Sequence, residues 1–319
     1  MNNDWRGSSA GRCLFLPALG LVLCLGAGCS VNRLAVNRLG DALAGGGATF
    51  AADDDPELVQ AAVPFSLKLM ESLLAESPEH KGLLLAAASG FTQYAYAFVQ
   101  QEADELEGDS LARATAMRAR ARRLYLRARN YGLRGLEASH DGFRAKLYAA
   151  PREAVRLAAR QDVALLYWTA ASWAAAISLA KDDPALIGEI PQMEALMDRA
   201  LALDEGFDQG AIHTFLITYE MARSGATGDP AARARRHFER AMALARGTQA
   251  APLVSFAEAV CVQMQDLQQF DELLKRALAI NPDAHPETRL TNLVMQRRAR
   301  WLLARRDELF LVPAPTKNP

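Results

Sequence analysis

The residue best placed for covalent chemistry is Cys29, which ends the run Leu-Gly-Ala-Gly-Cys at positions 25–29. Arg6 and Arg12 give the chain a basic start, and an apolar stretch over 13–25 leads into small residues before the cysteine. This order is typical of a bacterial export signal. The apolar stretch is shorter than the roughly 20 residues needed to span a bilayer. A thiol at the cleavage point can accept lipid, so the expected chemistry is acylation of Cys29.

The segment around Cys29 resembles the lipobox of bacterial lipoproteins, although its leucine stands four residues before the cysteine and not three. Residues 1–28 are therefore predicted to be a cleaved signal peptide. Residues 29–54, with three glycines at 45–47, are predicted to be a lipid-anchored, flexible linker. One acyl chain binds a membrane only weakly, so more than one is expected on Cys29. Ser30 stands where an aspartate would retain the protein at the inner membrane. The expected location is thus the periplasm, with lipid attachment to the outer membrane and the inner membrane as the alternative.

The other titratable residues form no catalytic or metal-binding pattern. The five histidines, at positions 80, 140, 213, 237 and 285, are scattered, and none has a second histidine or a cysteine at ligand spacing. His213 precedes Glu220 by two helical turns, but a core or surface histidine is the preferred interpretation. No P-loop, Rossmann, G-x-S-x-G or H-E-x-x-H motif is present. Neither an enzyme activity nor a cofactor or metal is expected.

Two further features have simple structural explanations. The three aspartates at 53–55 could be imagined as a calcium site, but a capped helix start explains the same acidic residues. Once the signal is removed and Cys29 is acylated, Cys261 is left without a cysteine partner. It lies in an apolar run, so we expect a buried small hydrophobic residue and no disulfide.

The composition indicates an all-helical body and no nucleic-acid partner. Half of the residues are hydrophobic, which is enough for a sizeable core, and nothing after Cys29 reaches 18 consecutive apolar residues. The formal net charge of −1 lacks the basic excess of nucleic-acid-binding chains. Alanine, leucine and arginine dominate, and the alternation typical of strands is nearly absent, so helices are expected almost throughout.

Helix starts and a repeat can be placed along the chain. A capping residue followed by proline predicts starts at Asp55-Pro56, Ser77-Pro78, Asp183-Pro184, Asp229-Pro230 and Asn281-Pro282. In 270–282, a small Ala277 five residues before a proline matches the second helix of a tetratricopeptide-like (TPR-like) repeat. Weaker copies put equivalent alanines at 128, 200 and 241, at spacings that bracket the period of about 34 residues and roughly its double. The predicted fold is all-α: stacked helical hairpins forming a TPR-like α-α superhelix over 55–310, with a flexible tail over 311–319.

Aromatic residues and arginines supply the candidate binding residues. Phe91, Tyr94 and Phe98 share one helical stripe, and with Tyr125 and Trp168 they are the candidates for an apolar cleft. A stripe of this kind is more often core, and that alternative stays open. Arg297, Arg298 and Arg300 lie in a basic helix end and are candidates for contact with an acidic partner surface. The alternative is solvated cations near a helix C-terminus.

The chain as a whole resembles the TatT family, the TPR-containing lipoprotein components associated with TRAP transporters. The resemblance covers residues 48–310 and is carried by the segments 50–59, 62–74, 77–85, 91–99, 121–133 and 289–303. It implies a periplasmic, lipid-anchored helical protein with cryptic repeats that forms homotrimers. It also implies two binding partners: the periplasmic substrate-binding protein of a TRAP system, and a hydrophobic small molecule held in an apolar cleft.

Two other classes of function stay open at this level. A TPR-like lipoprotein scaffold for outer-membrane or envelope protein assembly would have the same signal and the same helices. A lipid-anchored enzyme would need titratable residues that cluster only in the folded chain.

Overall fold

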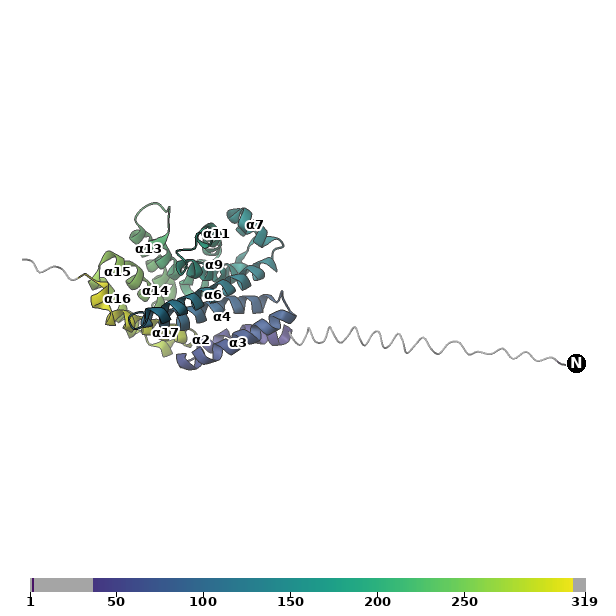
Figure 1. Cartoon of the computed structure of the whole chain (residues 1–319), viewed down its shortest axis with the longest axis horizontal. Helices are drawn as coiled ribbons and strands as arrows, with labels where there is room; N and C mark the ends of the chain where they lie inside the picture. The colour runs from purple at the N-terminus through teal and green to yellow at the C-terminus, as the bar shows by residue number, and fades with distance from the viewer. Residues whose placement is uncertain (1, 3–36, 312–319) are drawn as a thin grey trace, which may run out of the picture.

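The computed structural model describes Asn2 and residues 37–311, and every regular element among them is a helix (Figure 1). This confirms the all-α prediction. Apart from Asn2, the expected signal peptide lies outside the described residues, as do Cys29 and residues 312–319 of the expected tail.

The helices follow one another with short connections. Residues 37–45 are helical, and the first bounded helix is α2 (Gly47–Ala51). The longer helices are α3 (Pro56–Glu76), α4 (Lys81–Ala95), α6 (Leu111–Glu137), α9 (Val163–Ser178), α11 (Ile190–Leu203), α12 (Ala211–Ala222), α13 (Pro230–Ala245), α16 (Leu267–Ala279) and α17 (Arg289–Ala304). Shorter ones are α5 (Gln101–Leu106), α7 (Phe143–Ala149), α8 (Pro151–Ala154), α10 (Pro184–Ile187), α14 (Ala251–Phe256), α15 (Val262–Met264) and α18 (Arg306–Leu309). Two π-helical segments, η1 (Tyr96–Gln100) and η5 (Ala257–Cys261), continue α4 into α5 and α14 into α15.

The long helices pack as successive hairpins, in which α4, α9, α12 and α14 are first helices and α6, α11, α13 and α16 are second helices. First helices also contact the first helix of the next hairpin, as α4 does α9 and α12 does α14. The alanines predicted from the repeat pattern, at 128, 200, 241 and 277, all lie in second helices and are fully buried. Their small side chains allow the close helix packing that the pattern requires.

The first repeat spacing has a different origin from the one the sequence suggested. The separation between Ala128 and Ala200 is about twice the period, yet α6 packs directly on α9 and no hairpin lies between them. The extra residues form an insertion of short helices, α7, α8 and the 3-10 turns Val155–Leu157 and Arg160–Asp162. A doubled spacing therefore marks an insertion here and not a degenerate repeat.

Most predicted helix starts are confirmed. The carboxylates of Asp55, Asp183 and Asp229 each accept a hydrogen bond from the backbone N–H three residues on, at 2.8–3.2 Å. Asn281 caps only the short 3-10 turn Pro282–Ala284. The start predicted at Ser77-Pro78 is wrong, because Ser77 ends α3 and the next helix begins at Lys81, where the ring of His80 accepts from Leu83 N–H.

The segment expected to be a flexible linker is helical and packed where the structure describes it. Leu43 and Phe50 pack against the core, and Gly40 lies so close to His80 that a Cβ there would come within 2.9 Å of the ring. Asn37 contacts the loop between α3 and α4, accepting from Ser77 Oγ at 2.9 Å. From residue 37 onward this part of the chain belongs to the fold, because its apolar side chains find partners there.

The superhelix closes on itself. The last long helix, α17, packs against α14 and α16 on one side and against α2 and α3 on the other. Arg289 Nη1 donates to the carbonyl of Ala52 at 2.9 Å, and Tyr96 Oη lies 3.9 Å from Met295 Sδ. Figure 1 shows α17 beside α2 at the start of the array. The first and last helices of the array therefore cover each other's faces.

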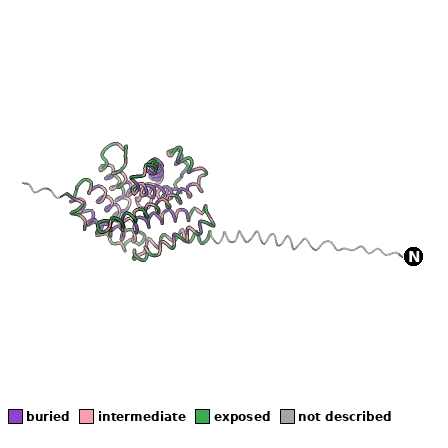
Figure 2. The backbone as a smooth tube through the Cα atoms, viewed as in Figure 1, coloured by how far each residue is buried: buried purple, intermediate pink, exposed green. Residues whose placement is uncertain are grey.

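The core runs along the middle of the array, where buried segments cluster in Figure 2. Helix α9 is apolar on nearly all sides and touches α4, α6 and α11, which is the pattern of a fully enclosed helix. Gly132 of α6 lets α9 approach closely, since a Cβ there would lie 2.0 Å from Thr169 Oγ1. By length and composition, α3 and the continuous helix Lys81–Leu106 could also cross a membrane, but more than half of the second helix's most apolar window is buried.

Candidate functional site

Four of the five aromatic candidates lie in the core. Phe91 stacks on Tyr131 with ring centroids 5.9 Å apart, and Tyr94 packs against Phe98 at 5.8 Å. Tyr125 is completely buried and donates to Gln100 Oε1 at 2.7 Å, while burial raises the pKa of its hydroxyl well above the usual value. The structure thus brings these side chains together as helix packing, and the expectation that they line an open cleft is wrong.

Trp168 is the one cleft candidate that remains partly exposed. It lies on α9 beside Tyr167, edge to face with ring centroids 4.9 Å apart, and Tyr167 in turn packs on Phe207 at 5.3 Å. Burial raises the pKa of the Tyr167 hydroxyl, although the residue is only partly buried. Tyr167 and Trp168 are therefore partly exposed rings that pack against Phe207 through Tyr167.

Tyr96 is a second accessible aromatic residue. It begins the π-helical segment η1 directly after α4, and 37% of the residue is exposed. Desolvation is the main cause that raises the pKa of its hydroxyl, with the nearby Glu258 carboxylate adding to it. Tyr96 is therefore partly exposed, although its hydroxyl is desolvated beside Met295. π-helical segments often mark functional positions.

The three arginine candidates on α17 have different environments. Arg298 is buried: its guanidinium donates to both carboxylate oxygens of Glu258, and its Nη1 lies 3.1 Å from Asp104 Oδ2. Burial opposes its charge, but Glu258 and Asp104 raise the pKa of Arg298 above its usual value. Arg298 is committed to internal packing, so its expected contact with an acidic partner is wrong.

The other two α17 arginines are exposed. Arg297 makes a two-pronged ion pair with Glu105 of α5, at 2.6 and 3.1 Å, and Arg300 faces solvent. The paired Arg297 helps to hold α17 on the first hairpin. Only Arg300 retains a guanidinium for which the structure gives no ion pair.

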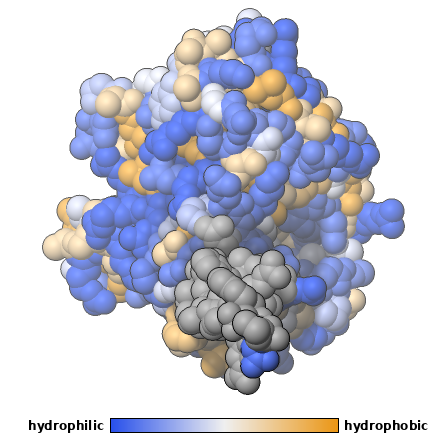
Figure 3. Space-filling model, turned by 90° about the vertical axis from the view of Figure 1, so that its right-hand side faces the viewer, coloured by the Kyte–Doolittle hydropathy of each residue, from blue (hydrophilic) through white to orange (hydrophobic). Residues whose placement is uncertain are grey.

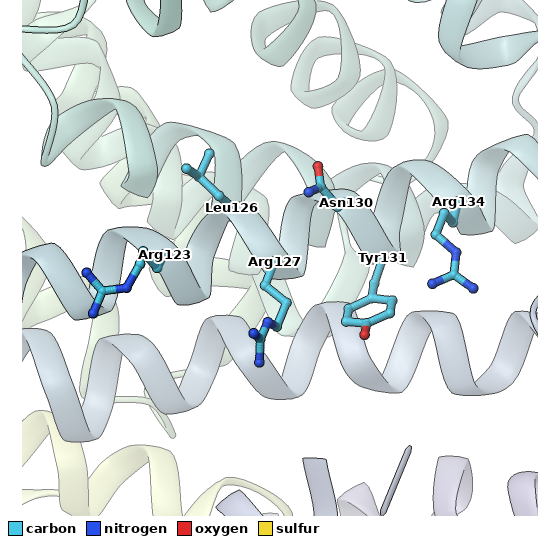
Figure 4. Close-up of a pocket in the computed structure, with 6 residues that line it drawn as sticks. All are labelled: Arg123, Leu126, Arg127, Asn130, Tyr131 and Arg134. Atoms are coloured by element: carbon cyan, nitrogen blue, oxygen red, sulfur yellow. The ribbon is translucent and has the colours of Figure 1, made fainter. Parts of the chain in front are cut away.

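Helix α6 carries a row of arginines that the sequence reasoning missed. Arg113, Arg120, Arg127 and Arg134 recur at every seventh position, and Arg123 lies on the same side of the helix. All five are exposed or partly exposed. The heptad spacing was visible in the sequence, but overall arginine enrichment hid it. Together with Leu126, Asn130 and Tyr131, three of these arginines line an open surface pocket of about 380 Å³ (Figure 4).

The histidines form one pair that the sequence did not predict. His213 of α12 and His237 of α13 face each other with their Nδ1 atoms 2.9 Å apart, and His213 Nε2 lies 3.4 Å from Glu205. Glu220 instead binds Arg223 and Arg233, so the suggested pairing of His213 with Glu220 is wrong. No group of three or more His, Cys, Asp or Glu side chains is placed for a metal ion within the described part of the chain.

Cys261 is buried as predicted, at the end of η5. Burial raises the pKa of its thiol to about 12. A thiol of this kind is a packing group and not a nucleophile.

Comparison with known proteins identifies the family of this chain. A family model described as the TRAP transporter T-component matches residues 52–310, which includes every long helix from α3 to α17. An uncharacterized protein of Treponema pallidum (strain Nichols) is 31% identical over 303 residues, covering 89% of this chain and 94% of the relative. The description makes this family a component of a transport system. The chain belongs to the TRAP transporter T-component family.

Proposed function

We propose that this protein is a periplasmic, lipid-anchored accessory component that binds the substrate-binding protein of a TRAP system. The observation that carries the proposal is the family match, which spans the entire helical array. Stacked helical hairpins are extended interaction surfaces, and they commonly serve to bind other proteins. The lipid anchor follows from the signal-like order of residues that ends at Cys29.

The proposed site for a hydrophobic ligand is now defined by the accessible aromatic residues and not by the buried stripe. Tyr167 and Trp168 of α9, which pack with Phe207, present partly exposed rings with a polar edge, which suits an apolar or aromatic molecule with a hydrogen-bonding group. Tyr96, 37% exposed beside Met295, is a separate accessible ring of the same kind.

The proposed homotrimer would need an exposed apolar surface, and α3 offers one. Phe65 is 73% exposed and Leu58 is 58% exposed, and both lie on the outer side of this edge helix. Single exposed hydrophobic residues are ordinary, but two large ones on the same side of one helix form a small apolar patch that a second copy of the chain could cover.

The test uses the chain beginning at Ser30, which keeps all described residues except Asn2. It is mixed with the substrate-binding protein of a TRAP system from the same genome, and the complex is measured by chemical cross-linking and native mass spectrometry. A stable complex is the expected result, and the same spectra give the subunit number and any co-purified small molecule. A complex formed instead with an outer-membrane assembly protein, and none with the substrate-binding protein, would move the protein to the scaffold class.

A ligand found in those spectra is tested by substitution. Trp168→Ala and Tyr96→Phe change accessible side chains and are expected to reduce its occupancy. Phe65→Ser, on the outer side of α3, is the matched control for ligand occupancy and is expected to change only the subunit number.

A further inference from the structure

The five arginines of α6 form a single linear surface, which we call the α6 arginine stripe: Arg113, Arg120, Arg123, Arg127 and Arg134. At 100° per residue they fall within an arc of about 80°, and they extend along about 32 Å of helix. The stripe is therefore a straight band of positive charge along the longest helix of the fold.

Little of this charge is neutralised among the described residues. Among the described residues, the one ion pair of the stripe joins Arg127 to Glu71 at 3.5 Å, and Glu71 also binds Lys68 at 2.5 Å. The neighbouring helix α4 contains no acidic residue.

Arginines on the other sides of α6 are paired. Arg118 binds Asp104 and Glu107, Arg122 binds Asp183, and Arg129 binds Glu189, at 2.6–2.9 Å. The same helix thus satisfies its inner arginines and leaves the outer row open for a partner from outside the fold.

Three of the five arginines of the stripe are held in place by aromatic rings. The guanidinium of Arg120 lies 5.8 Å from the Tyr94 ring, that of Arg127 lies 5.4 Å from Phe91, and that of Arg134 lies 5.3 Å from Tyr131. In Figure 4, Arg123, Arg127, Tyr131 and Arg134 point to the same side of α6, toward the adjacent helix. Because these heads are already ordered, less conformational entropy is lost when they bind an anion.

One end of the stripe lies where the chain enters the fold. Arg134 Nη2 donates to the carbonyl of Pro78 at 2.8 Å, and the flanking residues Ser77 and His80 contact Asn37. Asn37 is eight positions after Cys29, so the cysteine can be no more than about 28 Å from Asn37. This maximum distance of about 28 Å between Cys29 and Asn37 is shorter than the stripe, which is about 32 Å long.

We propose that the α6 arginine stripe binds the phosphate groups of anionic phospholipids in the membrane that carries the lipid anchor. The proposal rests on the anchoring of Cys29 in the proposed function. Anchoring at Cys29 keeps the Arg134 end of the stripe close to the bilayer, and tilting the molecule brings the other arginines onto the same surface. Guanidinium groups match phosphate oxygens in a two-pronged geometry, and a line of them fits a plane of headgroups.

An acidic protein surface is the competing occupant for the same charge. The Arg134 end of the stripe lies near Asn37, and this position favours the membrane as the occupant. A membrane-binding surface has to lie close to the lipid anchor, whereas a surface that binds a protein could lie at any distance from it. The two occupants also differ in their response to free phosphate, since a bilayer presents many headgroups at once and resists competition by a single ion.

The test is co-flotation of the chain beginning at Ser30 with vesicles of phosphatidylglycerol and phosphatidylcholine, compared with vesicles of phosphatidylcholine alone. Binding to the anionic vesicles only is expected. Arg113→Gln with Arg123→Gln should weaken it roughly 30-fold, since each basic residue at an anionic surface contributes about a factor of five. The side chains of these two arginines make no hydrogen bond or ion pair with other described residues, so the fold is expected to remain intact, which circular dichroism checks.

The matched control is Arg144→Gln with Arg152→Gln, which removes the same charge from exposed positions on α7 and α8. Vesicle binding at the original strength in this control supports the proposal. Equal weakening by both double variants, or no binding to phosphatidylglycerol, overturns it, as does full displacement by inorganic phosphate. The proposal is also overturned if the stripe variant binds vesicles as strongly as the unchanged protein but no longer cross-links to the substrate-binding protein. Cross-linking of the control variant to that protein reports on the proposed function separately.

Discussion

Arg298 Nη1 lies 3.1 Å from Asp104 Oδ2, and this contact joins the last long helix to the end of the first hairpin. The same guanidinium binds Glu258 of η5 and stacks over Trp301 at 4.2 Å. Asp104 is also held by Arg118 at 2.8 Å. One buried arginine thus connects three parts of the chain that are distant in sequence.

Replacing Arg298 with methionine is expected to lower the free energy of unfolding by about 2–3 kcal/mol, because Glu258 and Asp104 lose a buried counter-charge. Urea denaturation measures the change. The control is Arg297→Met on the adjacent residue, whose ion pair with Glu105 is half exposed and should contribute less than about 1 kcal/mol. Equal losses in the two variants would contradict a special role for Arg298.

Gly132→Ala is expected to destabilise the fold by about 1–3 kcal/mol, because its methyl group would overlap Thr169 Oγ1 where α6 meets α9. The gain in helix propensity from alanine, about 1 kcal/mol, opposes this only in part. Gly45→Ala, at a helical glycine whose added methyl group meets no atom within 4 Å, is the control for the propensity change. Adding Thr169→Ala to Gly132→Ala should recover stability, and a failure to recover would place the strain elsewhere.

The His213–His237 pair predicts a loss of stability in mild acid. Burial, with the His213 charge second, lowers the pKa of His237 to about 4, and burial also lowers that of His213. The unfolded histidines bind protons near pH 6.5, so stability present above that pH is lost as the pH falls toward about 4. The expected loss is on the order of 2 kcal/mol.

Urea denaturation at several pH values measures this loss, and His237→Gln is the informative variant. It should flatten the pH dependence between about 6.5 and 4. The charged groups that act on the pair are Glu205, Glu220, Arg223, Arg236 and Arg240. A wild-type slope retained in the variant would assign the effect to the carboxylates instead.

Cys261 is expected to resist thiol reagents in the native protein, because burial raises its pKa to about 12 and only 1% of the residue is exposed. In the chain beginning at Ser30 it is the one cysteine, so labelling with a maleimide reports on it alone. Labelling should become rapid only in denaturant. Rapid labelling of the folded chain would show that η5 opens frequently.

The helical array could be predicted from the sequence because its signals are local. Ala277 allows close packing in α16, and Pro282 follows shortly after that helix ends, so the two together mark a second helix. Asp229 marks the start of α13 because its side chain caps that helix. Ser77-Pro78 misled because the same two residue types can also end a helix and form a turn. Local spacing does not reveal which function a capping pair serves.

The candidate site was predicted less well because exposure depends on contacts between distant helices. Phe91 is buried because Tyr131 of α6 stacks on it. Arg298 is buried because α17 packs where Asp104 and Arg298 form an ion pair. Helical spacing alone places Tyr96 off the stripe of Phe91 and Phe98, but its partial exposure beside Met295 depends on where α17 packs. The periodicity that places a residue on a stripe does not say which neighbour covers that stripe.

Closure by α17 also fixes how many repeats the protein can have. An open hairpin array can gain or lose a unit at either end, since each unit touches only its neighbours. Here the contacts of Arg289 with Ala52 and of Arg298 with Asp104 require both ends to arrive at the same place. A duplicated or deleted hairpin would move one end out of reach, so length variation should be confined to insertions between helices, such as the short helices α7 and α8.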